Sequence, residues 1–159
     1  MTIAEQANAI ADALKDWAST NKGFVFIAAD PIACLSRIVQ AKPGAAMAGV
    51  LWQTEDPWGE YPENGKVLRQ WKVVLSRGKG LKLEPGQSLT EGVAGGEPMF
   101  DLVEQAREVC RSLRMIEEPG EFQLPVYRGM GPFDVSGYLL DAVEVRFSLY
   151  AQNAPQNLQ

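Results

Sequence analysis

One stretch near the end of the chain constrains the fold most, because it alternates strictly between two sets of residues. One set is Val143, Val145, Phe147 and Leu149, and the other is Ala142, Glu144, Arg146 and Ser148. A period of two is typical of an antiparallel strand with one buried face. Tyr127 and Arg128 begin a possible partner strand, joined to the first by a glycine-rich crossing. The sequence therefore predicts a closing pair of strands, of which the second is half-buried.

Two segments with helical spacing flank the predicted sheet. Thr2 and Glu5 form a capping-box signature, and Gly23 ends the segment that follows. The apolar stripe of this first helix is Ile3, Ala7, Ile10, Leu14 and Trp17. A second helix begins at Glu97-Pro98 and ends at Glu117–Gly120. Its predicted buried face is Met99, Leu102, Val103, Ala106, Val109, Cys110 and Leu113.

The segments between these helices predict further strands. Phe24–Ala29 is a continuous apolar run, typical of a buried strand, and Asp30-Pro31 then begins either a short helix or a single turn. Residues 47–53 and 67–76 predict two strands of a hairpin whose tip is long, acidic and aromatic. Gly78–Gly96 contains six glycines and predicts a long flexible loop.

This order of elements indicates an α+β fold. We expect a mainly antiparallel sheet on which the N-terminal helix and a second long helix pack. With 159 residues the chain predicts a single domain, over residues 1–151, followed by a flexible tail at 152–159.

Composition excludes several classes of chemistry. The chain has no histidine, which removes the usual general base and the commonest metal ligand. Its two cysteines, Cys34 and Cys110, lie in apolar helical patterns and are interpreted as reduced core thiols. We find no phosphate-binding loop, no secretory signal and no apolar run that could cross a bilayer. The net charge of −5 argues against tight binding to nucleic acid, and we expect no catalytic residue, cofactor or metal.

The hairpin tip carries the most conspicuous side chains. Glu55, Asp56, Glu60 and Glu63 could hold a cation or act as acid and base, but a solvated loop is the favoured interpretation. Trp58 and Tyr61 are large aromatic residues in a segment rich in proline and glycine. Such residues are typical of contact surfaces, although they could equally fold back over the sheet.

The pattern as a whole resembles the tail-terminator, or tail-completion, proteins of long-tailed bacteriophages. The resemblance lies in the order of elements: an N-terminal amphipathic helix, a hairpin with an extended tip, and a strand at Trp71–Leu75. A helix at Met99–Met115, the strand at Tyr127-Arg128, a Gly/Asp crossing and the closing strand Val143–Tyr150 complete it. The match covers most of the chain, and no catalytic motif is part of it.

The resemblance implies a structural role. Proteins of this family form a hexameric ring at the head-proximal end of the tail tube, stop tube polymerisation and dock the head-completion proteins. DNA passes through the ring without tight binding, and no membrane is involved. The protein would then be made in the bacterial cytoplasm and reside in the neck of the virion. We expect subunit or partner contacts at Trp52, Trp58, Tyr61, Tyr127, Arg128 and Phe133, and candidates for the lumen at Glu55, Asp56, Glu60 and Glu144.

Three alternatives stay open. The nearest is another neck component, such as a head-closure or connector protein. A carboxylate-dependent enzyme built on the acidic hairpin tip comes next, and a monomeric module that binds a small ligand or peptide comes last.

Overall fold

The computed structural model describes residues 1–42, 44–57, 65–77, 87–91, 97–116, 122–133 and 141–152. Its helices are α1 (Ile3–Thr20), α2 (Pro31–Val39), the short α3 (Gln87–Thr90) and α4 (Met99–Arg111). Its strands are β1 (Phe24–Ile27), β2 (Ala46–Pro57), β3 (Lys66–Arg77), β4 (Met115–Ile116), β5 (Phe122–Gln123), β6 (Val126–Pro132) and β7 (Ala142–Gln152).

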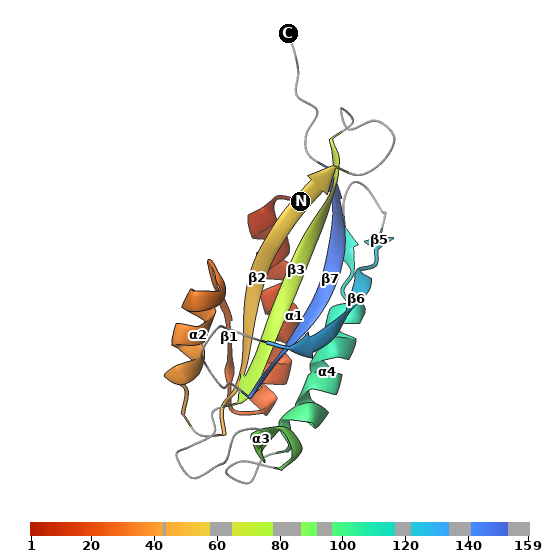
Figure 1. Ribbon diagram of the computed structural model, residues 1–159. Coiled ribbons are helices and arrows are strands. Elements are labelled where there is room, and N and C mark those ends of the chain that lie inside the picture. Colours follow the sequence, from red (N-terminus) through yellow and green to blue (C-terminus); the bar gives the residue numbers. More distant parts are fainter. Residues whose placement is uncertain are drawn as a thin grey trace.

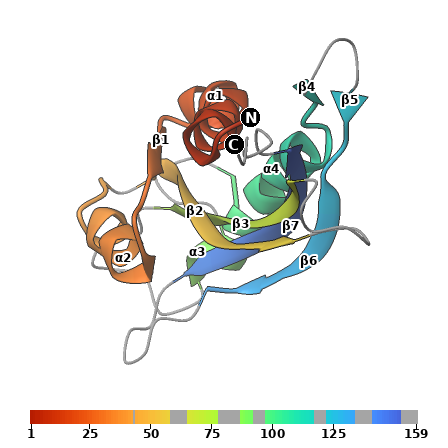
Figure 2. The same cartoon turned by 90° about the horizontal axis from the view of Figure 1, so that it is seen from above.

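Five of these strands form one sheet in the order β1-β2-β3-β7-β6. The β1–β2 pair is parallel, and every other pair in this sheet is antiparallel. Helices α1 and α4 lie against one face, while α2 lies on the other side next to β1 (Figure 1). The view from above shows the same division between the two faces (Figure 2). The α+β prediction is therefore confirmed, with the N-terminal helix and a second long helix on a mainly antiparallel sheet.

The predicted start of the N-terminal helix is confirmed. The Thr2 hydroxyl accepts a hydrogen bond from the Glu5 amide at 3.1 Å, and the Glu5 carboxylate accepts one from the Thr2 amide at 2.6 Å. Inside the fold, the Trp17 indole N–H donates to the carbonyl of Leu102 at 3.0 Å. This buried bond ties α1 to α4, so the two helices are held together as well as against the sheet.

The apolar residues form two clusters, one on each face of the sheet. The larger lies between the sheet and the pair α1 and α4, and includes Ile10, Leu14, Trp71, Leu102, Val145 and Phe147. The smaller lies under α2 and includes Phe26, Cys34, Met47, Leu51, Val74 and Phe133. Asp30 caps α2 by accepting from the Ala33 amide at 2.8 Å, which makes this segment a full helix of nine residues.

The prediction of a half-buried closing strand was wrong, because side chains on both faces of β7 are buried: helices α1 and α4 cover one face, and side chains of the neighbouring strands surround those on the other. β7 lies between β3 and β6, and the side chains expected on its polar face are enclosed: Ala142, Glu144 and Ser148 are buried and only Arg146 is half-buried. Alternation in the sequence identified the strand correctly. The alternation could not show that Lys72 on β3 and Arg128 on β6 would cover Glu144 and Ser148 on β7, which lies between these two strands.

Three smaller predictions also need correction. The second long helix ends at Arg111, where the Ser112 amide turns back to the carbonyls of Glu108 and Val109, and Met115–Ile116 pairs with Phe122–Gln123 instead of continuing it. The 78–96 segment contains the short helix α3 within its described part. The strand predicted as buried at Phe24–Ala29 is β1, which lies at the edge of the sheet and is only partly buried, with Ile27 exposed. The hairpin tip at 58–64 and the tail after Gln152 lie outside the described residues.

Candidate functional site

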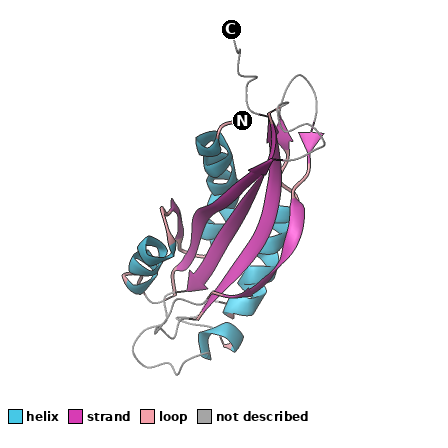
Figure 3. Cartoon of the chain, turned by 45° about the horizontal axis from the view of Figure 1, so that its top comes forward, coloured by secondary structure: helices cyan, strands magenta, loops and turns pink. Residues whose placement is uncertain are grey.

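The most distinctive surface of the described chain is the face of β3, β7 and β6 that points away from α1 and α4. Figure 3 shows the long strands in front of the two helices that cover their other face. Helix α2 lies over the β1 side of the sheet, so no described helix covers this part of the face. It carries polar side chains from three strands that are far apart in the sequence, while Val74, Ala142 and Phe133 at one end of it join the cluster under α2.

An ion-pair triad occupies the centre of this surface. Glu144 on β7 accepts from the Lys72 ammonium at 3.2 Å and from the Arg146 guanidinium at 3.3 Å. Lys72 on β3 lies directly across from Arg146 in the register, which brings both cations to one carboxylate. The side chains of Lys72 and Glu144 are largely buried, whereas that of Arg146 is 41% exposed.

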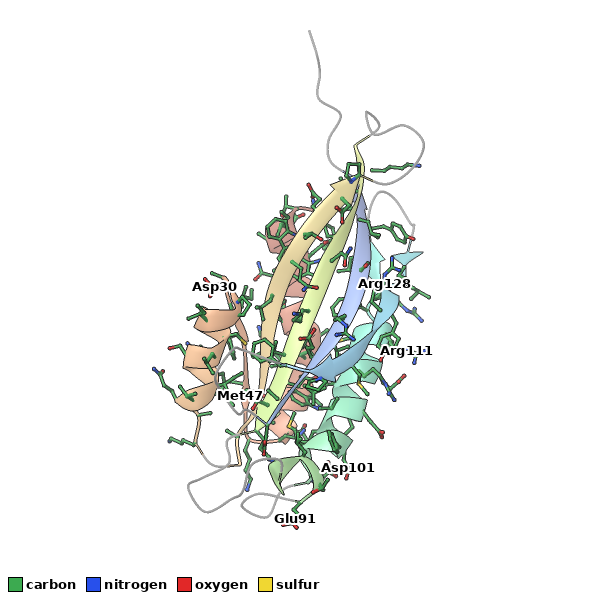
Figure 4. All side chains as sticks on the ribbon, in the orientation of Figure 1. Asp30, Met47, Glu91, Asp101, Arg111 and Arg128 are labelled. Atoms are coloured by element: carbon green, nitrogen blue, oxygen red, sulfur yellow. The ribbon has the colours of Figure 1, made fainter. Side chains whose placement is uncertain are left out.

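The local geometry of β6 holds a third cation beside the triad. A register shift between Tyr127 and Gly129 places Arg128 so that its Nε donates to the Ser148 hydroxyl at 3.2 Å. Figure 4 shows Arg128 beside β6 and β7. A bulge re-aims a side chain in this way because it adds one residue to one strand of the pair.

The Arg146 guanidinium lies over two glycines of β6, at distances that would be ordinary van der Waals contacts for a Cβ atom. A Cβ atom at Gly129 would lie 3.6 Å from Nη2, and one at Gly131 would lie 3.6 Å from Nη1 and 3.7 Å from Nη2. The guanidinium therefore rests over bare backbone of the neighbouring strand. Contact with the backbone beneath and the bond to Glu144 together restrict its position.

We refer to Lys72, Arg128, Glu144, Arg146 and Ser148 as the polar face. Among these five residues three cations surround one carboxylate, and Asp56, which accepts from Gln70 directly across from Ser148, adds a second carboxylate at one end of the same side of the sheet. The sequence shows no basic stripe, because these cations are scattered along it. The fold brings them together, which makes the polar face the strongest candidate for a site that recognises an anionic group.

The predicted lumen residues fall in different environments. Glu55 accepts from the Arg69 guanidinium at 2.8 Å, and Arg69 also donates to the carbonyl of Met1 at 2.6 Å. Asp56 is exposed and lies near Thr54 and Gln70. Glu55 and Asp56 are consecutive strand residues, so their side chains point to opposite faces and cannot act as a pair. Glu144 is held by its two cations, and Glu60 lies outside the described residues.

Substitutions at Glu55 and at Asp56 should have different effects on stability, because only Glu55 pairs with a buried guanidinium. We expect Glu55→Ala to lower the free energy of unfolding by about 2 kcal/mol, because it leaves the 3%-exposed Arg69 guanidinium without its carboxylate. Asp56→Ala, one residue further along, should change it by less than about 0.5 kcal/mol. Urea unfolding of both variants measures the difference, and equal losses would contradict the structural role of Glu55.

The predicted contact residues also differ in how far their side chains are exposed to solvent. Trp52 is 44% exposed, and Arg128 is exposed. Tyr127 is half-buried, and its ring lies under the Arg111 guanidinium at 5.2 Å. Phe133 is buried in the small cluster under α2, so its ring is packed within its own chain and we no longer expect it to contact a partner directly. Trp58 and Tyr61 lie outside the described residues.

Both cysteines are free and buried, in agreement with their interpretation as core thiols. Burial raises the pKa of each thiol from 9.0 to about 12, and the Lys72 charge partly opposes this at Cys34. A thiol that keeps its proton in the fold but ionises in the unfolded chain stabilises the fold at low pH. That contribution is complete below pH 9.0 and is lost as the pH rises towards about 12.

We therefore expect the urea midpoint to fall as the pH is raised above 9.0. A chain that carries Cys34→Ala and Cys110→Ala should lose part of this alkaline decline. Thiol reagents should modify the native protein only as fast as it unfolds. Rapid labelling of either cysteine under native conditions would show that its thiol is accessible.

We also searched the described residues for metal-binding groups, cavities and membrane-spanning helices. Its described residues hold no group of three or more Cys, Asp or Glu side chains that could bind a metal ion. An open hollow of about 580 Å³ lies between α1 and α4, lined by Ala9, Ala13, Gln105, Glu108, Val109, Ser112, Leu113 and Arg114. Among the described helices, none has the length and apolarity needed to span a membrane.

Comparison with known proteins adds no assignment. No protein-family model matches the sequence, and no curated protein matches it either.

Sequence reasoning missed most of the polar face. Arg128 was a predicted contact residue and Glu144 a predicted lumen residue, but Lys72, Arg146 and Ser148 were interpreted only as polar positions of strands. The Gly129-Met130-Gly131 spacing was the one available signal, since alternate glycines on a strand leave one face of it bare.

Proposed function

We propose that the protein is a structural component of a bacteriophage virion that resembles the tail terminators. In this role it forms a ring at the head-proximal end of the tail tube, ends tube polymerisation and docks the neck, while DNA passes through the lumen. The observation that carries the proposal is the one-sided covering of the sheet. Helices α1 and α4 cover one face, and the opposite face of β3, β7 and β6 presents charged side chains on a rigid support.

A surface of this kind suits assembly. Main-chain hydrogen bonds hold the strands of this surface in register. Ion pairs restrict its charged side chains, and the Arg146 guanidinium also lies against the backbone at Gly129 and Gly131. Little side-chain entropy would therefore be lost when a partner binds. The exposed Trp52 and the edge strand β1 provide further area for neighbours. The resemblance in the order of the predicted elements also supports the proposal.

The enzyme alternative loses support from the same geometry. Its candidate carboxylates included Glu55 and Asp56, which point to opposite faces of β2, and Glu55 is already paired with Arg69. A carboxylate that transfers a proton must be free to reach the reacting group of a substrate, and Glu55 is instead held by the Arg69 guanidinium. Another neck component shares every supporting feature and is distinguished only by its position in the particle.

Electron microscopy of intact particles is the direct test. We expect a closed ring of this chain between the tail tube and the neck, and tubes of irregular, excessive length when the protein is absent. A matched control is a particle in which the wild-type protein is resupplied, where tube length should return to its normal value. Density for a single copy, or no density at the neck, would reject the proposal.

A further inference from the structure

The polar face holds two guanidinium groups with unused hydrogen-bond donors. Arg128 is exposed, and its Nε donates to the Ser148 hydroxyl at 3.2 Å. Arg146 is 41% exposed, and its Nη1 donates to the Glu144 carboxylate at 3.3 Å. Within the described residues, no acceptor bonds to the Nη atoms of Arg128 or to Nη2 of Arg146. These nitrogens form the forks with which a guanidinium binds an oxyanion.

The carboxylates on this side of the sheet do not neutralise both arginines. Glu144 is shared between Arg146 and Lys72, which lies 3.2 Å from it. Asp56 accepts from Gln70 at 3.5 Å on β2, two strands away from β7 and therefore about 10 Å from it at the usual strand spacing. Three cations and these two carboxylates leave one positive charge in excess.

The register sets the spacing of the two guanidinium groups. Arg146 lies across from Gly129, and Ser148, which holds Arg128, is two residues further along β7. At the rise of a strand these two positions are about 7 Å apart on the same side of the sheet. Alternate residues of an extended peptide have the same separation and also point to one side. Two acidic side chains that are two positions apart therefore match the two guanidinium groups.

A protein segment complements this site better than a nucleic acid does. A duplex carries a continuous row of phosphates, and two accessible cations would neutralise only a small part of it. The net charge of −5 on the chain would repel the remaining phosphates. A short acidic segment instead places its charge only at the site, and carboxylates fit the parallel N–H groups of a guanidinium.

We propose that the polar face binds an extended acidic segment of a partner protein, in which two carboxylates two positions apart contact Arg128 and Arg146. Ser148 and Glu144 are positioning residues, because they hold the two guanidinium groups in place. The inference goes beyond the proposed function, since the site needs a single copy of the chain and no ring. Failure of either proposal would leave the other standing.

A peptide titration followed by nuclear magnetic resonance tests the site. The probe is a short acetylated and amidated peptide with two glutamates separated by one alanine. It should shift the Nε–H signals of Arg128 and Arg146. Arg128→Gln and Arg146→Gln should each weaken binding by at least about threefold, and the double variant by at least about tenfold. Raising the salt concentration should weaken binding to the wild type.

Arg37→Gln is the matched control, because it makes the same charge change at an exposed arginine whose guanidinium lies over the rings of Phe24 and Phe26. It should bind the peptide as the wild type does. A peptide with glutamine in place of both glutamates should not bind. One with adjacent glutamates, which point to opposite sides when extended, should bind at least about threefold more weakly.

Four results would overturn the inference. The first is a peptide that leaves the Arg128 and Arg146 signals of the wild type unmoved, a measurement that requires no variant to fold. The second is binding that the double variant retains in full. The third is equal binding of the glutamine peptide or of the peptide with adjacent glutamates. The fourth is tighter binding of duplex DNA than of the acidic peptide at the same salt concentration.

Discussion

Replacing Gly23 by alanine should lower the free energy of unfolding by at least about 4 kcal/mol and leave little folded protein. A Cβ atom at this position would lie 1.5 Å from the carbonyl oxygen of Ala46 and 2.4 Å from its carbonyl carbon. Both of these atoms belong to the backbone, which cannot move aside as a flexible side chain can. The Gly23 amide also donates to the carbonyl of Ala18 at 2.7 Å, so the residue is held on its other side by the end of α1.

Lys22→Ala is the matched control for this substitution. Lys22 already has a positive φ of 59° without being glycine, so alanine there introduces no new conformational demand. Its unfolding free energy should change by less than about 1 kcal/mol. Circular dichroism and urea unfolding of both variants would check the pair. A Gly23→Ala protein as stable as the control would mean that α1 and β2 separate easily, contrary to the close approach of Gly23 to the Ala46 backbone.

Trp71→Ala should remove about 3 to 5 kcal/mol of stability. Trp71 is 1% exposed at the centre of the larger cluster, where its indole N–H donates to the Gln6 side chain at 3.2 Å. Gln6 in turn donates to the carbonyl of Tyr150 at 3.1 Å. Truncation therefore leaves a large cavity and also a buried amide oxygen without its donor.

Trp52→Ala is the internal comparison, because Trp52 and Trp71 are opposite each other in the register of β2 and β3. Trp52 is 44% exposed, so its loss should lower monomer stability by less than about 1 kcal/mol. If Trp52 lies in a subunit contact, its truncation should weaken assembly while melting of the monomer hardly changes. Similar thermal destabilisation by both substitutions would show that both rings belong to the core.

The two tryptophans show that the sequence predicts strands but not the burial of each side chain. Both lie in segments that the alternation of residues identifies as strands, and both were placed in the correct hairpin. The pattern cannot tell them apart, because burial depends on where α1 and α4 end over the sheet. Phe133 is a case on the other face of the sheet: it was a predicted contact residue, and the tertiary fold packs its ring in the cluster under α2.

Local chemistry determined the parts of this protein that the sequence predicted well. The capping box at Thr2, the Asp30-Pro31 start of α2, the helical stripes and the strand alternation all depend on residues within a few positions of one another. These short-range preferences established the α+β class and the order of elements.

Tertiary structure alone decided the rest. The position of β7 between β3 and β6 buried the residues expected on its polar face, and the β6 bulge and glycines brought Arg128 and Arg146 together with Lys72. Lys72 and Arg146 are 74 positions apart in the chain but directly opposite in the sheet. Strand order and register are set by the packing of the whole core and not by any local segment, so the polar face could be recognised only once the chain was folded.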